Sequence, residues 1–383
     1  MKIIYCVPQL YRPGGIERIV SIKANSLVED YNCEVVIITS DQKGLPTYYP
    51  LSERIKVYDL GIDYDSMLQM PLQKRILKKL QLSGLHKKKL TSLLESLNAD
   101  ITISTFTHEA SFLPKIKDGS KKVLEFHFCR GHKKMMSDAF NFSLPTKLAY
   151  YFKCWQEENI IIPRFDQFVV LTEEDKERWK SKIKNVICIS NISPFDGANE
   201  TAKLVNKQAI AVGRLDAQKG FDRLISIWAD IHTHNTDWIL NIYGAGKHED
   251  RLRSQIKELN LEDVVIINSP DKDIKQRYLE SSLFLMTSSY EGLPMTLLEA
   301  QSLGLPAIAY DFKCGPKDVI KNGDSGYIIK DGNHTEFVSK VLSVIDNEEL
   351  RIKMGKNAAS LSSRYNRSTI MEKWMTLFNS LSK

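Results

Sequence analysis

The sequence lacks the features that mark membrane-spanning, disulfide-stabilised or repeat proteins. Its longest apolar stretches are only as long as core strands, and the first one breaks at Pro8 before a signal-peptide core could form. Its six cysteines include no C-x-x-C pair, and a chain of 383 residues does not need disulfides to fold. It contains no low-complexity tract and no internal repeat. We therefore expect a cytoplasmic protein with free thiols.

The length of the chain and its apolar pattern predict two α/β domains. A chain of 383 residues is too long for one ordinary hydrophobic core. Short apolar runs such as "MKIIYCV", "CEVVIITS", "QAIAVG" and "DWILNIY" alternate with helical segments. Continuous apolar runs are typical of parallel strands covered on both faces. The predicted fold class is α/β, with two doubly wound, Rossmann-like domains that face each other across a cleft.

A segment with few apolar residues separates the two halves. Residues 190–206 are rich in Ser, Asn, Pro and Gly and show no helical or strand period. We predict an N-terminal domain over residues 1–192 and a C-terminal domain over residues 193–365. A helical stripe in the last segment, residues 366–383, predicts a further helix with an apolar face; its members are Ile370, Trp374, Leu377, Phe378 and Leu381.

The net charge of +6 is concentrated in the first half. Residues 1–190 contain 29 Lys and Arg against 22 Asp and Glu, whereas the remainder contains 24 against 25. Part of this excess lies in residues 72–90, "LQKRILKKLQLSGLHKKKL". The segment predicts a basic amphipathic helix, which either lies on an anionic membrane surface or is an ordinary solvated helix face. No nucleic-acid-binding motif accompanies the charge, so we expect no nucleic-acid partner.

Two loops after predicted strands carry residues suited to an anion. Ligands of open α/β sheets bind beyond the carboxyl ends of the strands. Gly14 and Gly15 precede a helix, and they indicate either a close backbone approach to a ligand or a plain tight turn. Arg214 and Lys219 lie five residues apart on one loop. They suit a diphosphate, although each could also be a solvated loop charge.

A third loop is glycine-rich but incomplete as a motif. Gly244 and Gly246 lie between a strand and a helix in "YGAGKHEDRL". The third glycine of a dinucleotide fingerprint is missing, and no Ser or Thr follows Lys247 as in a Walker motif. By itself this loop is a weak indication of a phosphate site.

The fourth loop, "EGLPMTLLE", places acids on both sides of a helix start. Gly292 loosens the backbone, Pro294 fits the first turn of a helix, and the following amides predict an anion site. These amides belong to Leu293, Met295 and Thr296. Beside a bound phosphate, Glu291 and Glu299 could accept hydrogen bonds from sugar hydroxyls. Alternatively, Glu291 is an exposed loop acid and Glu299 is a helix acid paired with a nearby base.

Taken together, and in this order, the motifs resemble the family 4 glycosyltransferases of GT-B architecture. The resemblance rests on the E-x7-E pattern of "EGLPMTLLE", together with "PGGIERIV", "GRLDAQKGFDRLI", "YGAGKHEDRL" and "YDFKCGPKDVI". It runs along most of the chain and is strongest from about residue 205 to residue 330. It implies transfer of a sugar from a nucleotide diphosphate donor, with retention of anomeric configuration and without a catalytic metal ion. It also implies that the C-terminal helix returns to the N-terminal domain.

The resemblance implies a role for each of these positions. Arg214 and Lys219 would bind the donor diphosphate and stabilise its departure. Glu291 would face the transferred sugar and Glu299 the ribose. The loop residues Gly244, Gly246, Gly292, Leu293, Pro294 and Met295 would surround the donor. The amides of Gly14 and Gly15 would reach it from the opposite domain.

Histidines offer a further candidate. His127 follows a predicted strand, at the position where similar enzymes carry a histidine near the transferred sugar, and we expect it to bind rather than to abstract a proton. His108 is the alternative. His232 and His234 are close in sequence, but no third ligand is evident, so we predict no metal site and no cofactor.

Three functions agree with this pattern. The first is a glycosyltransferase that uses a UDP-sugar by the habit of the family, or a GDP-sugar. Its acceptor would be a saccharide or lipid-linked saccharide bound by the N-terminal domain, with the protein peripheral on the inner face of the cell membrane. The second is a sugar-nucleotide epimerase of the same architecture, and the third is a non-catalytic nucleotide-sugar binding module.

Overall fold

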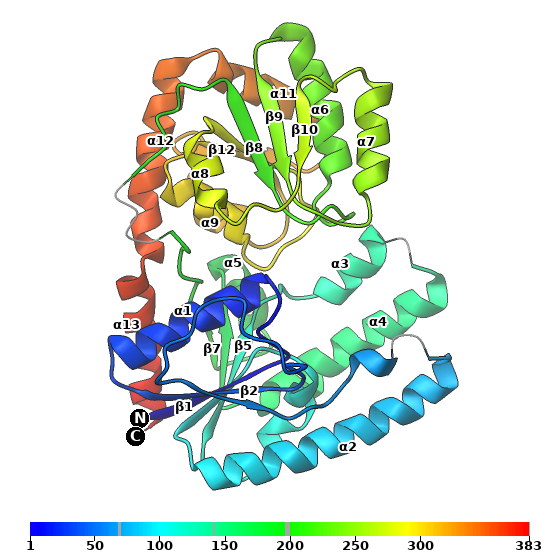
Figure 1. Ribbon diagram of the computed structural model, residues 1–383, viewed down its shortest axis with the longest axis vertical. Coiled ribbons are helices and arrows are strands. Elements are labelled where there is room, and N and C mark those ends of the chain that lie inside the picture. The colour runs from blue at the N-terminus through cyan, green and yellow to red at the C-terminus, as the bar shows by residue number, and fades with distance from the viewer. Residues whose placement is uncertain (68–69, 141, 196–199, 383) are drawn as a thin grey trace.

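A computed structural model describes residues 1–67, 70–140, 142–195 and 200–382 as two parallel-sheet domains (Figure 1). The sheet of the N-terminal domain has the strand order β3-β2-β1-β4-β5-β6-β7, and every pairing in it is parallel. Its strands are β1 (Lys2–Val7), β2 (Glu34–Thr39), β3 (Lys56–Asp59), β4 (Ile101–Ser104), β5 (Lys121–Phe126), β6 (Gln167–Val170) and β7 (Val186–Cys188).

The C-terminal domain repeats this plan with the strand order β10-β9-β8-β11-β12-β13, again all parallel. Its strands are β8 (Gln208–Val212), β9 (Ile239–Tyr243), β10 (Val265–Asn268), β11 (Leu283–Met286), β12 (Ala307–Asp311) and β13 (Gly326–Lys330). The central strands are buried on both faces, which explains their unbroken apolar sequences. The predicted fold class, two doubly wound α/β domains, is confirmed.

Helices cover both faces of the N-terminal sheet. One face packs against α1 and α13 through residues such as Val20, Ala24 and Trp374. The other packs against α2 and α5 through Leu90, Leu94 and Trp179. The helices of this domain are α1 (Gly15–Glu29), α2 (Leu72–Leu97), α3 (His132–Ala139), α4 (Leu144–Gln156), α5 (Glu173–Lys180) and α13 (Arg367–Leu381). Short 3-10 or π turns lie at Asp65–Met67, His108–Ser111, Leu113–Lys115, Glu157–Ile161 and Ile162–Arg164.

The C-terminal sheet is covered in the same way. Helices α6, α7 and α11 bury the apolar cluster around Trp228 and Phe337. Helices α8 and α9 bury the cluster around Tyr278 and Leu297 on the other face. The helices are α6 (Phe221–His234), α7 (Glu249–Glu258), α8 (Ile274–Leu279), α9 (Met295–Ser302), α10 (Pro316–Val319), α11 (His334–Ile345) and α12 (Glu348–Ser362).

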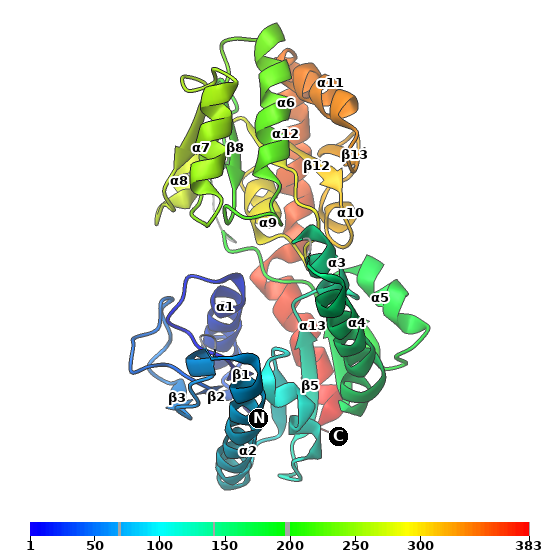
Figure 2. The same cartoon turned by 90° about the vertical axis from the view of Figure 1, so that its right-hand side faces the viewer.

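The chain crosses between the domains at two places. The first crossing lies in the predicted linker, where Ile192 belongs to the N-terminal core and Ala202 to the C-terminal core; residues 196–199 of that linker lie outside the described residues. The second leads from α12 through a 3-10 turn, Ser363–Tyr365, into α13. Figures 1 and 2 show α13 running back along the N-terminal domain.

The apolar face of the C-terminal helix has its partners in the first domain. Ile370, Met371, Trp374 and Phe378 are fully buried with residues of β1 and α1. Among the helices that the structure describes, none is long and apolar enough to cross a membrane.

Candidate functional site

The loops that follow the strands of both sheets meet at the seam between the domains (Figures 1 and 2). Gly292, from the loop before α9, lies against the backbone of the loop after β5. A Cβ atom at this position would be 2.2 Å from the carbonyl oxygen of His127, so only glycine fits there without a shift of the backbone. Gly15 at the start of α1 faces Met295 at the start of α9, and the position of its missing Cβ is 3.6 Å from Met295 Cγ. The loop before α9 in the C-terminal domain and the glycine turn before α1 in the N-terminal domain therefore reach the same seam.

Lys219 and Glu291 form an ion pair in this seam. Lys219 Nζ donates to Glu291 Oε1 at 2.8 Å, and the two side chains are only 13% and 11% exposed. Gln218 lies beside them and donates from Nε2 to the carbonyl oxygen of Tyr290 at 3.0 Å and to Glu291 Oε2 at 3.3 Å. The predicted diphosphate ligand Lys219 and the predicted sugar ligand Glu291 are thus brought together and satisfy one another.

Arg214 lies at the open edge of the same group. Its side chain is 71% exposed. Its Nη2 donates to Gln218 Oε1 at 2.9 Å and lies 3.3 Å from Asp216 Oδ2. An exposed guanidinium can turn towards an incoming anion, because few contacts hold it in place.

The amides at the start of α9 point into the seam. The helix begins at Met295, and Pro294, which was predicted to fit the first turn, is its N-cap residue with an extended ψ of 105°. The amides of Leu297 and Leu298 both donate to the carbonyl oxygen of Pro294. Within the described residues, the amides of Leu293, Met295 and Thr296 have no hydrogen-bond partner. Free amides at a helix N-terminus favour an anion.

Glu299 lies deeper in the seam and is paired with a base from the other domain. Its carboxylate accepts from Arg18 Nη1 at 2.7 Å and from the hydroxyl of Tyr278 at 2.9 Å. Burial raises the pKa of Glu299, while Arg18 and Tyr278 act in the opposite direction. The guanidinium of Arg18 also lies over the rings of Phe195 and Tyr49, at 5.2 and 5.9 Å from their centroids. Both oxygens of the predicted ribose ligand therefore have protein partners here.

His127 is held by a buried charge pair. Its Nε2 lies 3.2 Å from Glu125 Oε1 but makes no hydrogen bond among the described residues. Lys23 of α1 binds both oxygens of Glu125, and its ammonium lies 4.4 Å from the ring centroid of Trp374 in α13. Burial opposes the charge of Glu125, but Lys23 and His127 outweigh it and hold the pKa of Glu125 at about 2. The imidazole of His127 is therefore positioned by groups from α1, β5 and α13.

The first turn of α1 adds an acid for which no role was predicted. Glu17 accepts from Gln9 Nε2 at 2.8 Å, and burial raises the pKa of its carboxyl group. The amide of Gly14 donates to the carbonyl oxygen of Arg12 at 2.9 Å, as in a tight turn. Of the two glycine amides predicted to reach a ligand, only that of Gly15 is therefore open among the described contacts.

Gly244 and Gly246 have a packing role in this structure. A Cβ atom at Gly244 would lie 1.9 Å from the carbonyl oxygen of Gly213, and one at Gly246 would lie 2.4 Å from that of Leu215. Both glycines allow the loop after β9 to press against the loop that carries Arg214 and Lys219. They support the site through this contact.

The remaining histidine candidates lie elsewhere. His108 stacks on Tyr64 with ring centroids 3.7 Å apart, and burial lowers the pKa of its imidazole. His234 Nδ1 contacts the backbone oxygen of Asp230 at the end of α6. In the part of the chain that the structure describes, no group of three His, Cys, Asp or Glu side chains could hold a metal ion.

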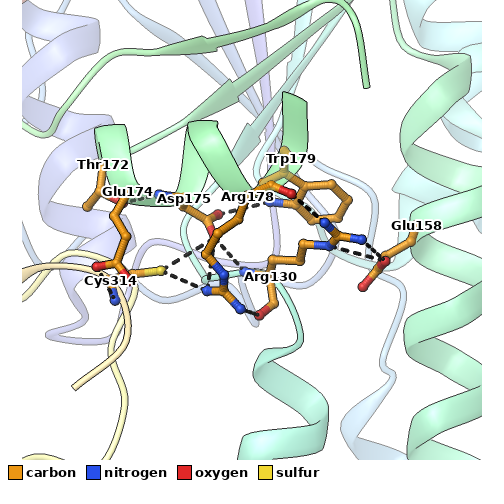
Figure 3. A network of polar contacts seen from close by, with 8 residues as sticks. All are labelled: Arg130, Glu158, Thr172, Glu174, Asp175, Arg178, Trp179 and Cys314. Carbon is orange, nitrogen blue, oxygen red and sulfur yellow. Dashed lines mark hydrogen bonds and ion pairs between the residues drawn. The ribbon is translucent and has the colours of Figure 1, made fainter. Parts of the chain in front are cut away.

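A separate network joins the two domains on the side of α5 (Figure 3). Arg178 donates from Nη1 to Cys314 Sγ at 3.2 Å and from Nη2 to the carbonyl oxygen of Arg130 at 3.0 Å. The amide of Cys314 donates to Glu174 Oε2 at 3.2 Å. Asp175 accepts from the amide of Arg130 at 2.9 Å. Because Cys314 belongs to the C-terminal domain, this network holds the loops after β5 and β12 against each other.

A surface hollow opens beside the seam. Its volume is about 640 Å³, and it is lined by Tyr11, Leu45, Pro46, Thr47, Tyr48, Tyr49 and Lys272. All of these except Lys272 come from the loops after β1 and β2 in the N-terminal domain. The ring of Tyr49 also contacts Arg18, which connects the hollow to Glu299.

The chain is similar in sequence to known glycosyltransferases. Residues 196–361 match the family model for glycosyl transferases group 1. Along 381 residues the chain is 29% identical to an uncharacterized glycosyltransferase of Haemophilus influenzae, covering 97% of this chain and 98% of that protein. Along 222 residues it is 39% identical to the amylovoran biosynthesis glycosyltransferase AmsD of Erwinia amylovora, covering 56% of this chain and 62% of that protein.

The fold comparison decides the architecture. The structure of Staphylococcus aureus TarM, in complex with UDP and α-GlcNAc-glycerol, aligns with a TM-score of 0.75 over 99% of both chains, at 18% sequence identity. The protein has the GT-B fold. Its similarity to glycosyltransferases is thus found in sequence along nearly the whole chain and in the arrangement of both domains.

Sequence reasoning missed four residues that the structure brings to the site. Three of them carried a signal: Arg18 lies in "GGIERIV", and Gln218 lies between Arg214 and Lys219. Glu17 lies in the first of these motifs as well. Tyr278 had no signal, since it meets Glu299 only through the packing of α8 on α9.

We predict that Arg18 and Glu299 are energetically coupled across the seam. Arg18→Ala and Glu299→Gln should each lower the free energy of unfolding by about 1–3 kcal/mol, because each leaves a poorly solvated partner behind. The double variant should lose less than the sum, with a coupling of about 0.5–3 kcal/mol. Urea unfolding of the four proteins measures this. The exposed pair Lys207 and Asp237, changed to Ala and Asn, is the control. Changes in unfolding free energy that are additive for Arg18 and Glu299, as they should be for the control pair, would contradict the assignment.

Proposed function

We propose that this protein is a glycosyltransferase that moves a sugar from a nucleotide diphosphate donor to a saccharide or lipid-linked saccharide in the synthesis of a surface polysaccharide. The observation that carries this proposal is the Lys219–Glu291 ion pair next to the free amides of Leu293 and Met295. This arrangement offers a cation and amide donors to a diphosphate, and a carboxylate to sugar hydroxyls. The similarity to the Haemophilus glycosyltransferase along nearly the whole chain supports it.

The donor is a UDP-sugar. The TarM structure of the same fold contains UDP. When the diphosphate binds, Lys219 exchanges its contact with Glu291 for a phosphate oxygen, and exposed Arg214 turns inward to the same group. Glu291 is then free to accept hydrogen bonds from the hydroxyls of the transferred sugar.

The chemical step is transfer with retention and without a metal ion. The acceptor hydroxyl attacks the anomeric carbon on the face from which the diphosphate leaves, the bond from that carbon to the phosphate oxygen breaks, and a phosphate oxygen of the leaving group takes the hydroxyl proton. The leaving diphosphate gains negative charge in this step, and Lys219, Arg214 and the amides at the start of α9 stabilise that charge. These groups supply the electrostatic stabilisation that a divalent cation provides elsewhere. His127, positioned by Glu125, binds the transferred sugar from the N-terminal side.

The ribose of the donor binds at Glu299. Because Arg18 and Tyr278 occupy both oxygens of Glu299 in this structure, a ribose diol has to displace Arg18 or share an oxygen with it. Displacement weakens one contact between the domains. Donor binding is therefore linked to the relative position of the two domains.

The acceptor saccharide binds in the tyrosine-lined hollow. Tyr48 and Leu45 are each 47% exposed there, and aromatic rings offer flat apolar faces to the C–H bonds of a sugar. The hollow is joined to the donor site through Tyr49 and Arg18. We further propose that the protein works at the inner face of the cell membrane, next to an anionic surface reached through residues 72–90.

Two other functions make different forecasts. An epimerase would change the donor sugar without an acceptor, and a binding module would bind the donor without turnover. Incubation of the donor alone and with acceptor separates all three.

We predict that Lys219→Ala lowers kcat for sugar transfer by about 10²–10³-fold, because it removes one pre-aimed donor from the leaving group. A thermal-shift screen of UDP- and GDP-sugars first identifies the donor, since a ligand at 100 times its Kd adds about 2.7 kcal/mol to stability. Transfer is then measured in excess EDTA. Lys207→Ala, an exposed lysine of the same domain, is the matched control. A Lys219→Ala enzyme as fast as the control, or transfer abolished by EDTA, would overturn this part of the proposal.

We also predict that Tyr48→Ala raises KM for the acceptor about tenfold and leaves KM for the donor unchanged, because one stacking surface is lost. Initial rates at varied acceptor and donor concentrations measure both constants. Tyr58→Ala, which removes an exposed tyrosine from β3, is the control. Equal effects of the two variants on the acceptor would exclude the hollow as its binding site.

A further inference from the structure

Helix α4 carries a row of exposed apolar side chains. Each member is more than half exposed, and the spacing of four, four and three residues places them along one side of the helix. The row consists of Leu144, Leu148, Phe152 and Trp155. Proteins rarely leave a contiguous apolar surface of this size open unless it meets a partner or a membrane.

The first part of α2 adds to this surface, whereas the rest of the helix does not. Ile76, Leu77 and Leu80 are each more than half exposed. Further along, Leu82, Leu90 and Leu94 are buried in the core of the N-terminal domain. Among the described side chains of residues 72–90, the apolar groups that are more than half exposed lie between Ile76 and Leu80, and Leu85 is 42% exposed. The segment is therefore not one uniform amphipathic face, and the row on α4 supplies the larger part of the surface.

Lysines of three helices gather beside these apolar groups. Lys79 of α2 is close enough to Lys133 of α3 and Lys153 of α4 to affect their ionisation. Burial, together with these neighbouring cations, lowers the pKa of Lys153, and it lowers that of Lys133 to about 8. Three like charges held together provide a place for an anion.

Acidic groups only partly offset these cations. Lys133 pairs with Glu157, and Lys147 lies 3.1 Å from Asp138. The sequence from residue 70 to residue 94 contains seven Lys and Arg and no Asp or Glu, and α4 contains two lysines and no acid. The surface therefore combines exposed apolar groups with an excess of positive charge.

We propose that the α2–α4 face docks on an anionic lipid bilayer. This face consists of Ile76, Leu77 and Leu80 of α2 and Leu144, Leu148, Phe152 and Trp155 of α4, with the lysines of α2, α3 and α4 around them. The apolar row enters the boundary between headgroups and acyl chains, and the lysines bind the lipid phosphates. A second copy of the chain is a poorer occupant, because it would bring two positively charged faces together.

The position of α4 relates this docking to sugar transfer, a link that rests on the proposed function. Helix α3 connects the loop after β5 to α4, and that loop carries His127. The ring of Phe128 stacks on His132 at the start of α3, with centroids 4.5 Å apart. On the other side, Lys247 of the C-terminal domain lies over the ring of Phe140 at 4.6 Å. A bilayer at α4 thus lies next to α3, which connects to the loop that carries His127 and contacts the C-terminal domain.

Trp155 makes the inference directly measurable. It is exposed, whereas Trp179, Trp228, Trp238 and Trp374 are buried in the folded protein. Its fluorescence should shift to shorter wavelength on vesicles of phosphatidylglycerol and phosphatidylcholine in equal parts, and brominated lipids should quench it. Vesicles of phosphatidylcholine alone should bind much less, and high salt should release the protein.

Two variants test the two components of the face in vesicle co-sedimentation. Leu148→Glu/Phe152→Glu should weaken binding by about two orders of magnitude, because it removes the apolar insertion. Lys74→Glu/Lys79→Glu should weaken it by about tenfold or more. Leu259→Glu is the control, since it changes an exposed leucine directly after α7 in the other domain. All variants replace exposed side chains, and circular dichroism melting checks that each is folded.

The outcomes separate this inference from the proposed function. Vesicle binding needs neither donor nor acceptor, and transfer to a water-soluble acceptor needs no vesicles. Unchanged vesicle binding by Leu148→Glu/Phe152→Glu would overturn the inference. So would equal binding to charged and neutral vesicles, or a concentration-dependent dimer in place of vesicle binding. In any of these cases, transfer to a soluble acceptor by the wild-type protein would leave the proposed function intact.

Discussion

The ion pair between Lys219 and Glu291 is the interaction on which the site depends. Two mostly buried charges of opposite sign lie at the seam, and each satisfies the other while no ligand is bound. A charge in such a place is stable only with a partner. The pair therefore holds a cation and a hydrogen-bond acceptor in the seam without leaving either charge unpaired. A phosphate can replace Glu291 as the partner of Lys219, and the hydroxyls of a neighbouring sugar can replace Lys219 as the partner of Glu291.

The N-terminal domain completes the site through its own buried charges. Lys23 and Glu125 place His127, and Arg18 reaches across to Glu299. Both arrangements use helix α1, which begins at the glycine turn facing α9. The C-terminal helix is part of the same support, because Trp374 covers Lys23. A displacement of one domain would thus alter the surroundings of His127 and Glu299 together.

The fold could be predicted from the sequence, because buried parallel strands have unbroken apolar sequences. The loops after these strands lie at one edge of each sheet. The meeting of Arg214, Lys219 and Glu291 was predictable for the same reason. Arg18 and Glu299, however, are 281 residues apart in the chain, and their contact depends on how the domains face each other. The packing role of Gly244 and Gly246 also needed the neighbouring loop. The division of α2 into an exposed and a buried part depends on which of its residues pack against the sheet. The hydrophobic periodicity of the sequence does not contain that information.

The central claim is that Glu291 contacts the sugar of the donor and not only its nucleotide. Thermal stabilisation of Glu291→Ala by a UDP-sugar and by UDP tests it most directly. We expect the variant to lose much more of the stabilisation by the UDP-sugar than of that by UDP. Equal losses for the two ligands would contradict the account.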